Sequence, residues 1–230
     1  MIRMVVFDMA GTTVNENNAV YKTLRSAINE ANFDFSLDEV LEAGAGKEKL
    51  QAIRSILMKR NIEDEQLASQ IFGRFLVLLD ETYSTQEIYE QDNATKLFHA
   101  LKDRDVLVVL NTGYNRATAE TLIKKIGWKK GSDYDLLVTA SDVANNRPSP
   151  DMILNAMQHF GFEDPAEVMK VGDSTVDVME GKNAGCLINI GITTGAHTAS
   201  QLTAANPEYI VHNLIELLAI VAEENQAETV

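Results

Sequence analysis

Cysteine, positive charge and long apolar runs are all scarce in this 230-residue chain. Cys186 is the only cysteine, so no disulfide can form within the chain, and we expect a reducing, cytoplasmic setting. No apolar run approaches the ~20 residues of a membrane-spanning helix. The first residues lack a basic segment followed by a long apolar one, so we expect no signal peptide.

Positive charge is outweighed by negative charge: 20 Lys and Arg residues face 34 Asp and Glu residues, giving a net charge of −14. Such an acidic surface argues against a nucleic-acid backbone or an anionic membrane as a partner. An anionic substrate would need positive charge concentrated at its binding site. The composition leaves the assembly open, with a homodimer as one option.

Apolar residues make up 45% of the chain, which is enough for a full hydrophobic core. Short apolar runs alternate with segments of helical periodicity. The expected strands are 4–7, 106–110, 136–138, 167–171, 187–190 and 209–211. Strands that alternate with helices predict an α/β fold, a doubly wound parallel sheet.

Residues 15–88 interrupt this alternation, because they show helical periodicity and no strand signal. Four helices are expected, over 20–31, 37–42, 50–57 and 67–78, with Ser36 as the cap of the second. The glycine-rich turn 44–46 should end that helix. We therefore predict a core formed by 1–14 and 89–230, with 15–88 as an inserted helical domain.

Polar residues follow the predicted strands at the points where the strands end. Because the carboxyl ends of parallel strands meet at one edge of a sheet, these side chains should converge. A carboxylate can attack phosphorus, hydroxyl and amide groups can hold phosphoryl oxygens, and a further carboxylate can hold Mg²⁺. The candidates are Asp8, Thr112 with Gly113, Arg147 as the charge-balancing cation, Asp173 for the metal, and Asp177 to orient other groups.

This pattern resembles the haloacid dehalogenase superfamily of phosphohydrolases over nearly the whole chain. The resemblance implies that Asp8 is the nucleophile and that Arg147 balances the crowded anions. It implies that Asp8, Asp173 and the carbonyl of Ala10 hold Mg²⁺, while residues 10–12 and the Thr112-Gly113 loop bind phosphate. It also implies that the helical insertion is a C1-type cap, which closes over a small phosphorylated or phosphonate substrate.

The first motif departs from the common phosphatase pattern of this superfamily. Most members carry a second Asp two positions after the nucleophile, where this chain has Ala10. The Asp-x-Ala-Gly-Thr form is similar to the phosphonoacetaldehyde hydrolase branch, which the Thr112-Gly113-Tyr114, Gly172-Asp173 and 180–185 segments also resemble. In that branch a cap lysine forms a Schiff base, and the imine accepts the electrons when the C–P bond breaks.

Lys49 is the candidate for this lysine, because Gly46, Lys49, Ile53 and Arg54 match the spacing of the branch. Lys47 is a nearby competitor, and a solvated surface lysine is the simpler interpretation of either. One position disagrees with C–P cleavage: where the branch carries a histidine for proton transfer, this chain has Ala52.

Three functional hypotheses follow from these observations. The first is Mg²⁺-dependent C–P hydrolysis through Lys49, and the second is phosphate-ester hydrolysis without a Schiff base. The third is a catalytically weak module that binds phosphate or a protein partner. Two further residues are weaker candidates: His197 could reach the edge of the site or cap a loop, and Met9 could touch a leaving group or simply pack.

Overall fold

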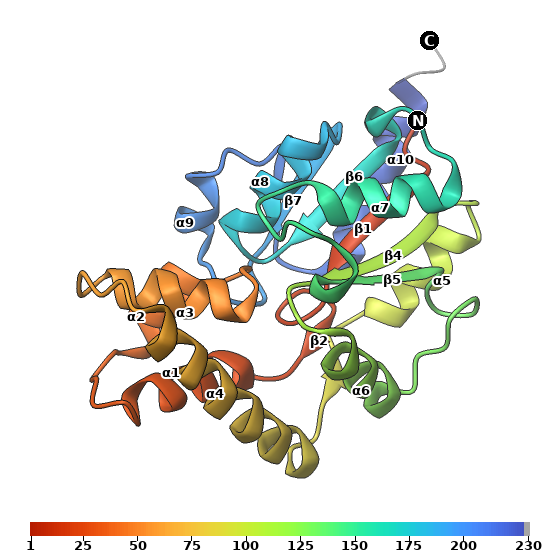
Figure 1. Ribbon diagram of the computed structural model, residues 1–230. Helices are drawn as coiled ribbons and strands as arrows, with labels where there is room; N and C mark the ends of the chain where they lie inside the picture. The colour runs from red at the N-terminus through yellow and green to blue at the C-terminus, as the bar shows by residue number, and fades with distance from the viewer. Residues whose placement is uncertain (228–230) are drawn as a thin grey trace.

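The computed structural model describes residues 1–227, and a six-stranded sheet forms its centre (Figure 1). Its strands are β1 (Met4–Asp8), β4 (Leu107–Thr112), β5 (Leu136–Thr139), β6 (Val168–Gly172), β7 (Ile188–Ile192) and β8 (Tyr209–Val211). They lie in the order β5-β4-β1-β6-β7-β8, and each neighbouring pair runs parallel. The prediction of a parallel α/β sheet is therefore confirmed.

Alternate side chains of β1 enter two apolar layers on opposite faces of the sheet. Val5 and Phe7 belong to the larger layer, where Phe7 packs on Phe98 with ring centroids 5.3 Å apart. Met4 and Val6 belong to the smaller layer. Helices α5 (Ala94–Lys102) and α10 (Leu217–Ala227) cover the first face, whereas α7 (Asp151–Phe160) and α8 (Thr175–Ala184) cover the second.

The remaining elements of this part of the chain are short or peripheral. They are α6 (Arg116–Ile126), α9 (Ala199–Thr203) and the 3₁₀ turns η1 (Ala140–Asp142), η2 (Pro165–Glu167) and η3 (Leu214–Glu216). Among residues 1–227, no helix combines the length and apolar character that a bilayer crossing requires.

Four helices lie together beside the sheet and form the predicted helical segment (Figure 1). They are α1 (Ala19–Asn29), α2 (Leu37–Gly44), α3 (Lys49–Met58) and α4 (Glu65–Thr85), and each packs against at least two of the others. Ser36 caps α2 as expected: its hydroxyl accepts the Glu39 N–H, and the Glu39 carboxylate accepts the Ser36 N–H.

Two details of the sequence interpretation were wrong. The segment 15–88 was expected to contain no strand, but its first residue belongs to β2 (Val14–Asn15), which pairs antiparallel with β3 (Tyr89–Glu90) just beyond its end. This pair joins the two connections between the helical segment and the sheet. The residue type of Ser149, followed by Pro150, predicts a cap for the next helix, but Ser149 does not cap α7, which begins directly after Pro150. The Ser149 hydroxyl instead donates to the Asp151 carboxylate at 2.6 Å. Neither two-residue strands nor a Ser–Asp bond produces a periodic signal.

The turn before α3 lies against the carboxyl edge of the sheet. Gly46 has a φ of 75°, and a Cβ atom there would lie 2.2 Å from the Ser174 hydroxyl. On the opposite side of the contact, a Cβ atom on Gly113 would lie 2.9 Å from the Lys47 carbonyl oxygen. The helical segment therefore closes onto the core through contacts that leave no room for a side chain.

A pair of glycine substitutions separates this contact from backbone strain. Gly46→Ala and Gly127→Ala both place a side chain at positive φ, and each should lower the free energy of unfolding by roughly 1 kcal/mol. Only Gly46→Ala should also push the helical segment outward, because Gly127 has no heavy atom within 4 Å of the added Cβ. Urea unfolding measures the first effect, and the radius of gyration from X-ray scattering measures the second. Equal radii for the two variants would contradict a tight contact at Gly46.

Candidate active site

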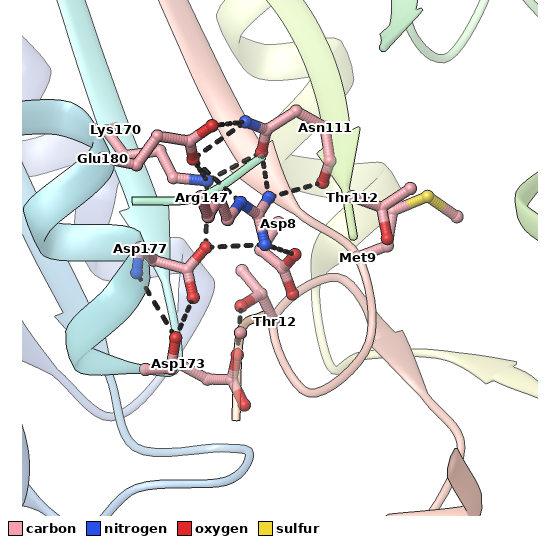
Figure 2. Close-up of polar contacts among 12 residues, drawn as sticks. Asp8, Met9, Thr12, Asn111, Thr112, Arg147, Lys170, Asp173, Asp177 and Glu180 are labelled. Atoms are coloured by element: carbon pink, nitrogen blue, oxygen red, sulfur yellow. Dashed lines mark hydrogen bonds and ion pairs between the residues drawn. The ribbon is translucent and has the colours of Figure 1, made fainter. Parts of the chain in front are cut away.

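The carboxyl ends of three adjacent strands bring the predicted polar residues to one edge of the sheet. Asp8 ends β1, Thr112 ends β4, and Asp173 directly follows β6. Because β1 lies between β4 and β6, Asp8 occupies the centre of this edge. Arg147, from the loop before α7, reaches Asp8 as well (Figure 2). The structure therefore brings together side chains that the sequence places up to 165 residues apart.

Arg147 is the most heavily engaged side chain of this cluster and exposes only 1% of its surface. Nη1 donates to Asp8 Oδ1 at 2.6 Å and lies 3.0 Å from Asp177 Oδ1. Nε donates to Glu180 Oε2 at 2.9 Å, and Nη2 donates to the side-chain oxygen of Asn111 at 2.6 Å. All three guanidinium nitrogens have acceptors, so the side chain has one fixed orientation.

Sequence analysis assigned no role to Lys170, Glu180 or Asn111, which form the base of the cluster (Figure 2). Lys170 Nζ donates to Asn111 Oδ1 at 2.7 Å and lies 3.1 Å from the carboxylates of Asp177 and Glu180. Asn111 Nδ2 donates to Glu180 at 2.9 Å. The available signal was Lys170 itself, since a lysine inside the apolar run of a central strand is rarely buried unless it is paired.

Both carboxylate oxygens of Asp177 are committed to neighbours. Oδ1 faces Arg147 and Lys170, and Oδ2 accepts the Ser174 hydroxyl at 2.5 Å. Burial acts to raise the pKa of Asp177, but the two cations outweigh it and hold the pKa below its ordinary value. This arrangement supports the orienting role predicted for Asp177 over a role as metal ligand.

The pKa values of Asp8 and Asp173 are shifted upward, in the opposite direction from that of Asp177. Burial raises the pKa of Asp8, although Arg147 opposes the shift. Burial also raises the pKa of Asp173 well above its ordinary value, and the charges of Asp8 and Asp177 add to the effect. Oxygens of these three carboxylates lie within 4.8 Å of one another. Two desolvated carboxylates at this separation are an environment in which a divalent cation is stabilised.

Charge counting supports a cation at this place. The buried carboxylates of Asp8, Asp173, Asp177 and Glu180 outnumber the buried cations Arg147 and Lys170 by four to two. If all are ionised, two negative charges remain uncompensated, which one Mg²⁺ would balance. Since Asp177 is committed, Asp8 and Asp173 are the carboxylates that fit a metal. The carbonyl of Ala10, predicted as the third protein ligand, stays a prediction.

The carboxylate of Asp173 is fixed by a loop from β7. The Ala196 N–H donates to Oδ2 at 2.6 Å, and the Thr12 hydroxyl lies 3.4 Å from Oδ1. Gly11 and Gly195 lie against this carboxylate. A Cβ atom would lie 2.3 Å from Oδ2 if added to Gly11 and 1.9 Å from it if added to Gly195. This close backbone approach explains why both positions are glycine.

The predicted phosphate-binding groups differ in whether their hydrogen-bond donors already have acceptors within the protein. The N–H groups of Gly11 and Thr12 donate within their own turn, to the carbonyls of Val14 and Met9. The Thr112 hydroxyl accepts the Tyr114 N–H at 3.2 Å, so its own proton can still be donated. Figure 2 shows the Met9 side chain directed away from Arg147, and Met9 is fully buried in the apolar core.

Lys49 begins α3 and is buried, exposing 7% of its surface. Its ammonium donates to the Lys47 carbonyl at 2.9 Å and lies over the rings of Tyr21 and Tyr114, 5.4 and 5.2 Å from their centroids. Burial lowers the pKa of Lys49, while the charge of Asp8 opposes the shift. The ammonium of Lys49 therefore interacts electrostatically with the Asp8 carboxylate of the core.

Lys47, the predicted competitor, lies elsewhere. Its ammonium donates to the Ser55 hydroxyl at 2.9 Å, on the same helical segment, and it is less buried than Lys49. Ala52 is fully buried in the apolar core, so no proton-transfer group stands at that position.

His197 is buried and supports the loop that holds Asp173. Its Nδ1 accepts the Thr175 N–H at 3.1 Å, at the first turn of α8. Its backbone N–H donates to the Asp173 carbonyl at 3.2 Å. Burial lowers the pKa of the imidazole. These contacts match the loop-capping interpretation of His197.

Comparisons with known proteins agree with this geometry. A family model described as haloacid dehalogenase-like hydrolase matches residues 5–189. The chain is 30% identical to phosphonoacetaldehyde hydrolase of Latilactobacillus sakei, with 96% of each chain covered. It is 29% identical to a probable phosphatase of Dickeya dadantii, over 94% of this chain and 91% of that one. A phosphonoacetaldehyde hydrolase-like protein from Oleispira antarctica superposes with a TM-score of 0.84 at 20% identity, over 98% and 93% of the two chains.

The raised pKa values of Asp8 and Asp173 predict how stability depends on pH without metal. Between their ordinary value of 3.8 and the higher values in the folded state, the folded protein binds more protons than the unfolded one. In chelator, these two groups should therefore make the free energy of unfolding fall as pH rises through that window. Asp173→Asn should flatten the dependence, whereas Asp103→Asn, at an exposed helix end, should not.

The same variants test the metal. Mg²⁺ at neutral pH should raise the melting temperature of the wild-type protein and of Asp103→Asn, since an ion that binds only the folded state stabilises it. The gain should disappear in Asp173→Asn. An equal Mg²⁺ response in all three proteins, followed by calorimetry, would contradict a metal at Asp8 and Asp173.

Proposed function

Because the chain belongs to the haloacid dehalogenase-like hydrolase family, we propose that it is a Mg²⁺-dependent hydrolase of a small phosphonate or phosphate, with Asp8 as nucleophile. The observation that carries this proposal is the bond of 2.6 Å between Arg147 and Asp8. Arg147 favours the ionised form of Asp8, and only the carboxylate can attack phosphorus. The Asp8 oxygen not bound to Arg147 is the one available for the reaction.

The other groups of the cluster act around this attack. Asp8 and Asp173 would hold Mg²⁺, which supplies charge stabilisation to the phosphoryl oxygens when bound. The Thr112 hydroxyl would donate to one of these oxygens, since its proton has no acceptor among the described residues. The attack breaks the bond between phosphorus and the leaving group and forms an aspartyl phosphate on Asp8. Water then hydrolyses that acyl phosphate.

We infer that residues 15–88 act as a cap and that the structure describes its closed position. The tight approaches at Gly46 and Gly113 support this interpretation, since opening would separate both pairs of groups. The ribbon of β2 and β3 at the two connections is a suitable pivot. A closed cap excludes water from Asp8 and from the buried ammonium of Lys49.

The burial of Lys49 favours C–P hydrolysis of phosphonoacetaldehyde or a close relative. A lysine must be neutral to attack an aldehyde, and burial lowers its pKa toward that state. Lys49 would form an imine with loss of water. The electron pair of the C–P bond would then move into the protonated imine, giving an enamine on Lys49 and phosphorylated Asp8. Protonation and hydrolysis of the enamine by water would release the aldehyde product and regenerate the amine of Lys49. This route needs no acid at position 10, where the chain has Ala10.

Phosphate-ester hydrolysis remains the second candidate, supported by two observations. The chain is nearly as similar to a probable phosphatase as to a phosphonoacetaldehyde hydrolase. Ala52 also stands where the phosphonoacetaldehyde hydrolase branch carries a histidine, so the C–P route lacks that proton-transfer group. In this alternative, Lys49 would bind the phosphate ester as a cation. The ion-paired cluster around Arg147 argues against the third hypothesis, a catalytically weak binding module.

Asp8→Asn should abolish turnover, because the amide cannot form the phosphoryl intermediate. The fold should survive, since the amide oxygen can still accept from Arg147. Activity assays with Mg²⁺, paired with mass spectrometry to exclude deamidation, make the measurement. Substantial turnover in a sample shown to be free of Asp8 would remove it from the nucleophile role.

Lys49→Arg separates the two candidate reactions, with Lys47→Arg as the matched control. If the enzyme cleaves C–P bonds, Lys49→Arg should abolish turnover of phosphonoacetaldehyde, because a guanidinium forms no imine. If it hydrolyses phosphate esters, the variant should mainly raise KM. Borohydride reduction with phosphonoacetaldehyde should label Lys49 only in the first case. A label on Lys47, or loss of activity in Lys47→Arg alone, would show that the wrong lysine was chosen.

A further inference from the structure

The ammonium of Lys49 lies between tyrosines from two different parts of the molecule. Tyr21 belongs to α1 of the cap, and its hydroxyl accepts the Gly46 N–H at 3.1 Å. Tyr114 belongs to the core, in the loop that follows β4. Lys49 therefore contacts the core through the ring of Tyr114, which fixes the position of the amine together with the Lys47 carbonyl and Tyr21 when the cap is closed.

The hydroxyl of Tyr114 begins a buried chain of hydrogen bonds. It lies 2.8 Å from the Tyr83 hydroxyl, which donates to Glu16 Oε2 at 3.1 Å. Because Tyr83 uses its one proton for Glu16, the shared proton of the first bond must come from Tyr114. Glu16 also accepts the Val20 N–H at 2.7 Å, so its carboxylate is held at the start of α1. The three side chains are all buried.

This chain crosses from the core to both connections of the cap. Glu16 lies in the first connection, between β2 and α1, and Tyr83 lies in the last turn of α4, shortly before the second. The Tyr83–Tyr114 bond is a cap–core bond, and cap opening would separate its two partners. Closing the cap therefore forms this bond and the Lys49–Tyr114 contact together.

We propose that Glu16 and Tyr83 are positioning residues: they hold Tyr114 against Lys49 when the cap closes, and so place the amine for reaction with the substrate. The proposal rests on the proposed function, because it assumes that Lys49 acts on the substrate. It extends that function to two residues at the cap connections that touch neither Asp8 nor Arg147 in any described contact.

Tyr83→Phe tests the proposal, because it removes one hydroxyl and keeps the ring that packs on Tyr114. The Tyr114 proton then loses its acceptor and Glu16 loses a donor. Of the two bonds lost, the one to Tyr114 acts on Lys49, and its loss should lower kcat about tenfold, with KM changed less. Tyr209→Phe is the matched control, because it removes from β8 a hydroxyl bonded to Glu224, and β8 is an edge strand that three other strands separate from β4, after which Tyr114 lies. It should leave kcat unchanged.

A second measurement does not depend on any substrate. Amide hydrogen exchange over residues 44–50 should be faster in Tyr83→Phe than in the wild-type protein and in Tyr209→Phe, because the cap opens more often. Adding Glu16→Gln should accelerate this exchange by a smaller factor in the Tyr83→Phe protein than in the wild type, since both substitutions break the same chain of hydrogen bonds.

The outcomes separate this proposal from the proposed function. Faster exchange in Tyr83→Phe supports the cap–core bond even if the protein hydrolyses nothing, in which case only the proposed function fails. Unchanged exchange overturns the bond as a closure element. An active enzyme whose kcat is the same in Tyr83→Phe and Tyr209→Phe overturns the positioning of Lys49, as would full additivity of the two substitutions.

Discussion

The buried guanidinium of Arg147 is the interaction on which the rest of the site depends. It joins the carboxylates of Asp8, Asp177 and Glu180 to the oxygens of Asn111, and so links β1, β4 and α8. Removing such a charge from water is costly, and only well-placed partners offset the cost. Removing Arg147 would leave the Asp8 carboxylate without its cation and Lys170 alone facing those of Asp177 and Glu180. The contact with Arg147 also opposes the rise in the pKa of Asp8 that burial causes.

The same balance explains how an acidic protein can bind an anionic substrate. The net charge of −14 repels anions at long range, so attraction must come from the site itself. Arg147 and Lys170 already face three carboxylates, those of Asp8, Asp177 and Glu180, and have no surplus to offer. A divalent cation held by Asp8 and Asp173 would supply the missing positive charge. In the phosphate-ester alternative, the ammonium of Lys49 would add to it, so that the proposed cap and the metal would share one electrostatic task.

Much of the fold was predictable because its signals are local. Strands β1 and β4 end at Asp8 and Thr112, Asp173 directly follows β6, and parallel strands must present those ends on one edge. The helical segment was visible from its periodicity. Neither argument could find the ribbon of β2 and β3, whose strands are two residues long.

The site was predictable where polar residues follow a strand directly or in the next loop or helix turn, and at Lys49, whose role only the family resemblance indicated. Lys170 and Glu180 lie inside β6 and α8, where sequence periodicity treats a charge as an exception and cannot name its partner. Glu16, Tyr83 and Tyr114 come from three distant segments, and nothing in their spacing indicates a hydrogen-bonded chain. The pairing of Lys47 with Ser55, which separates it from Lys49, also depends on side-chain direction that sequence does not specify.

The most direct test of this account is to look for phosphoryl on Asp8 during turnover. Enzyme mixed with Mg²⁺ and phosphonoacetaldehyde, or with a phosphate ester, would be quenched in acid within milliseconds and digested for mass spectrometry. The account predicts one phosphoryl group on the peptide that contains Asp8, and none in Asp8→Asn. Turnover of either substrate without a phosphorylated peptide, or with phosphoryl on another residue, would contradict it.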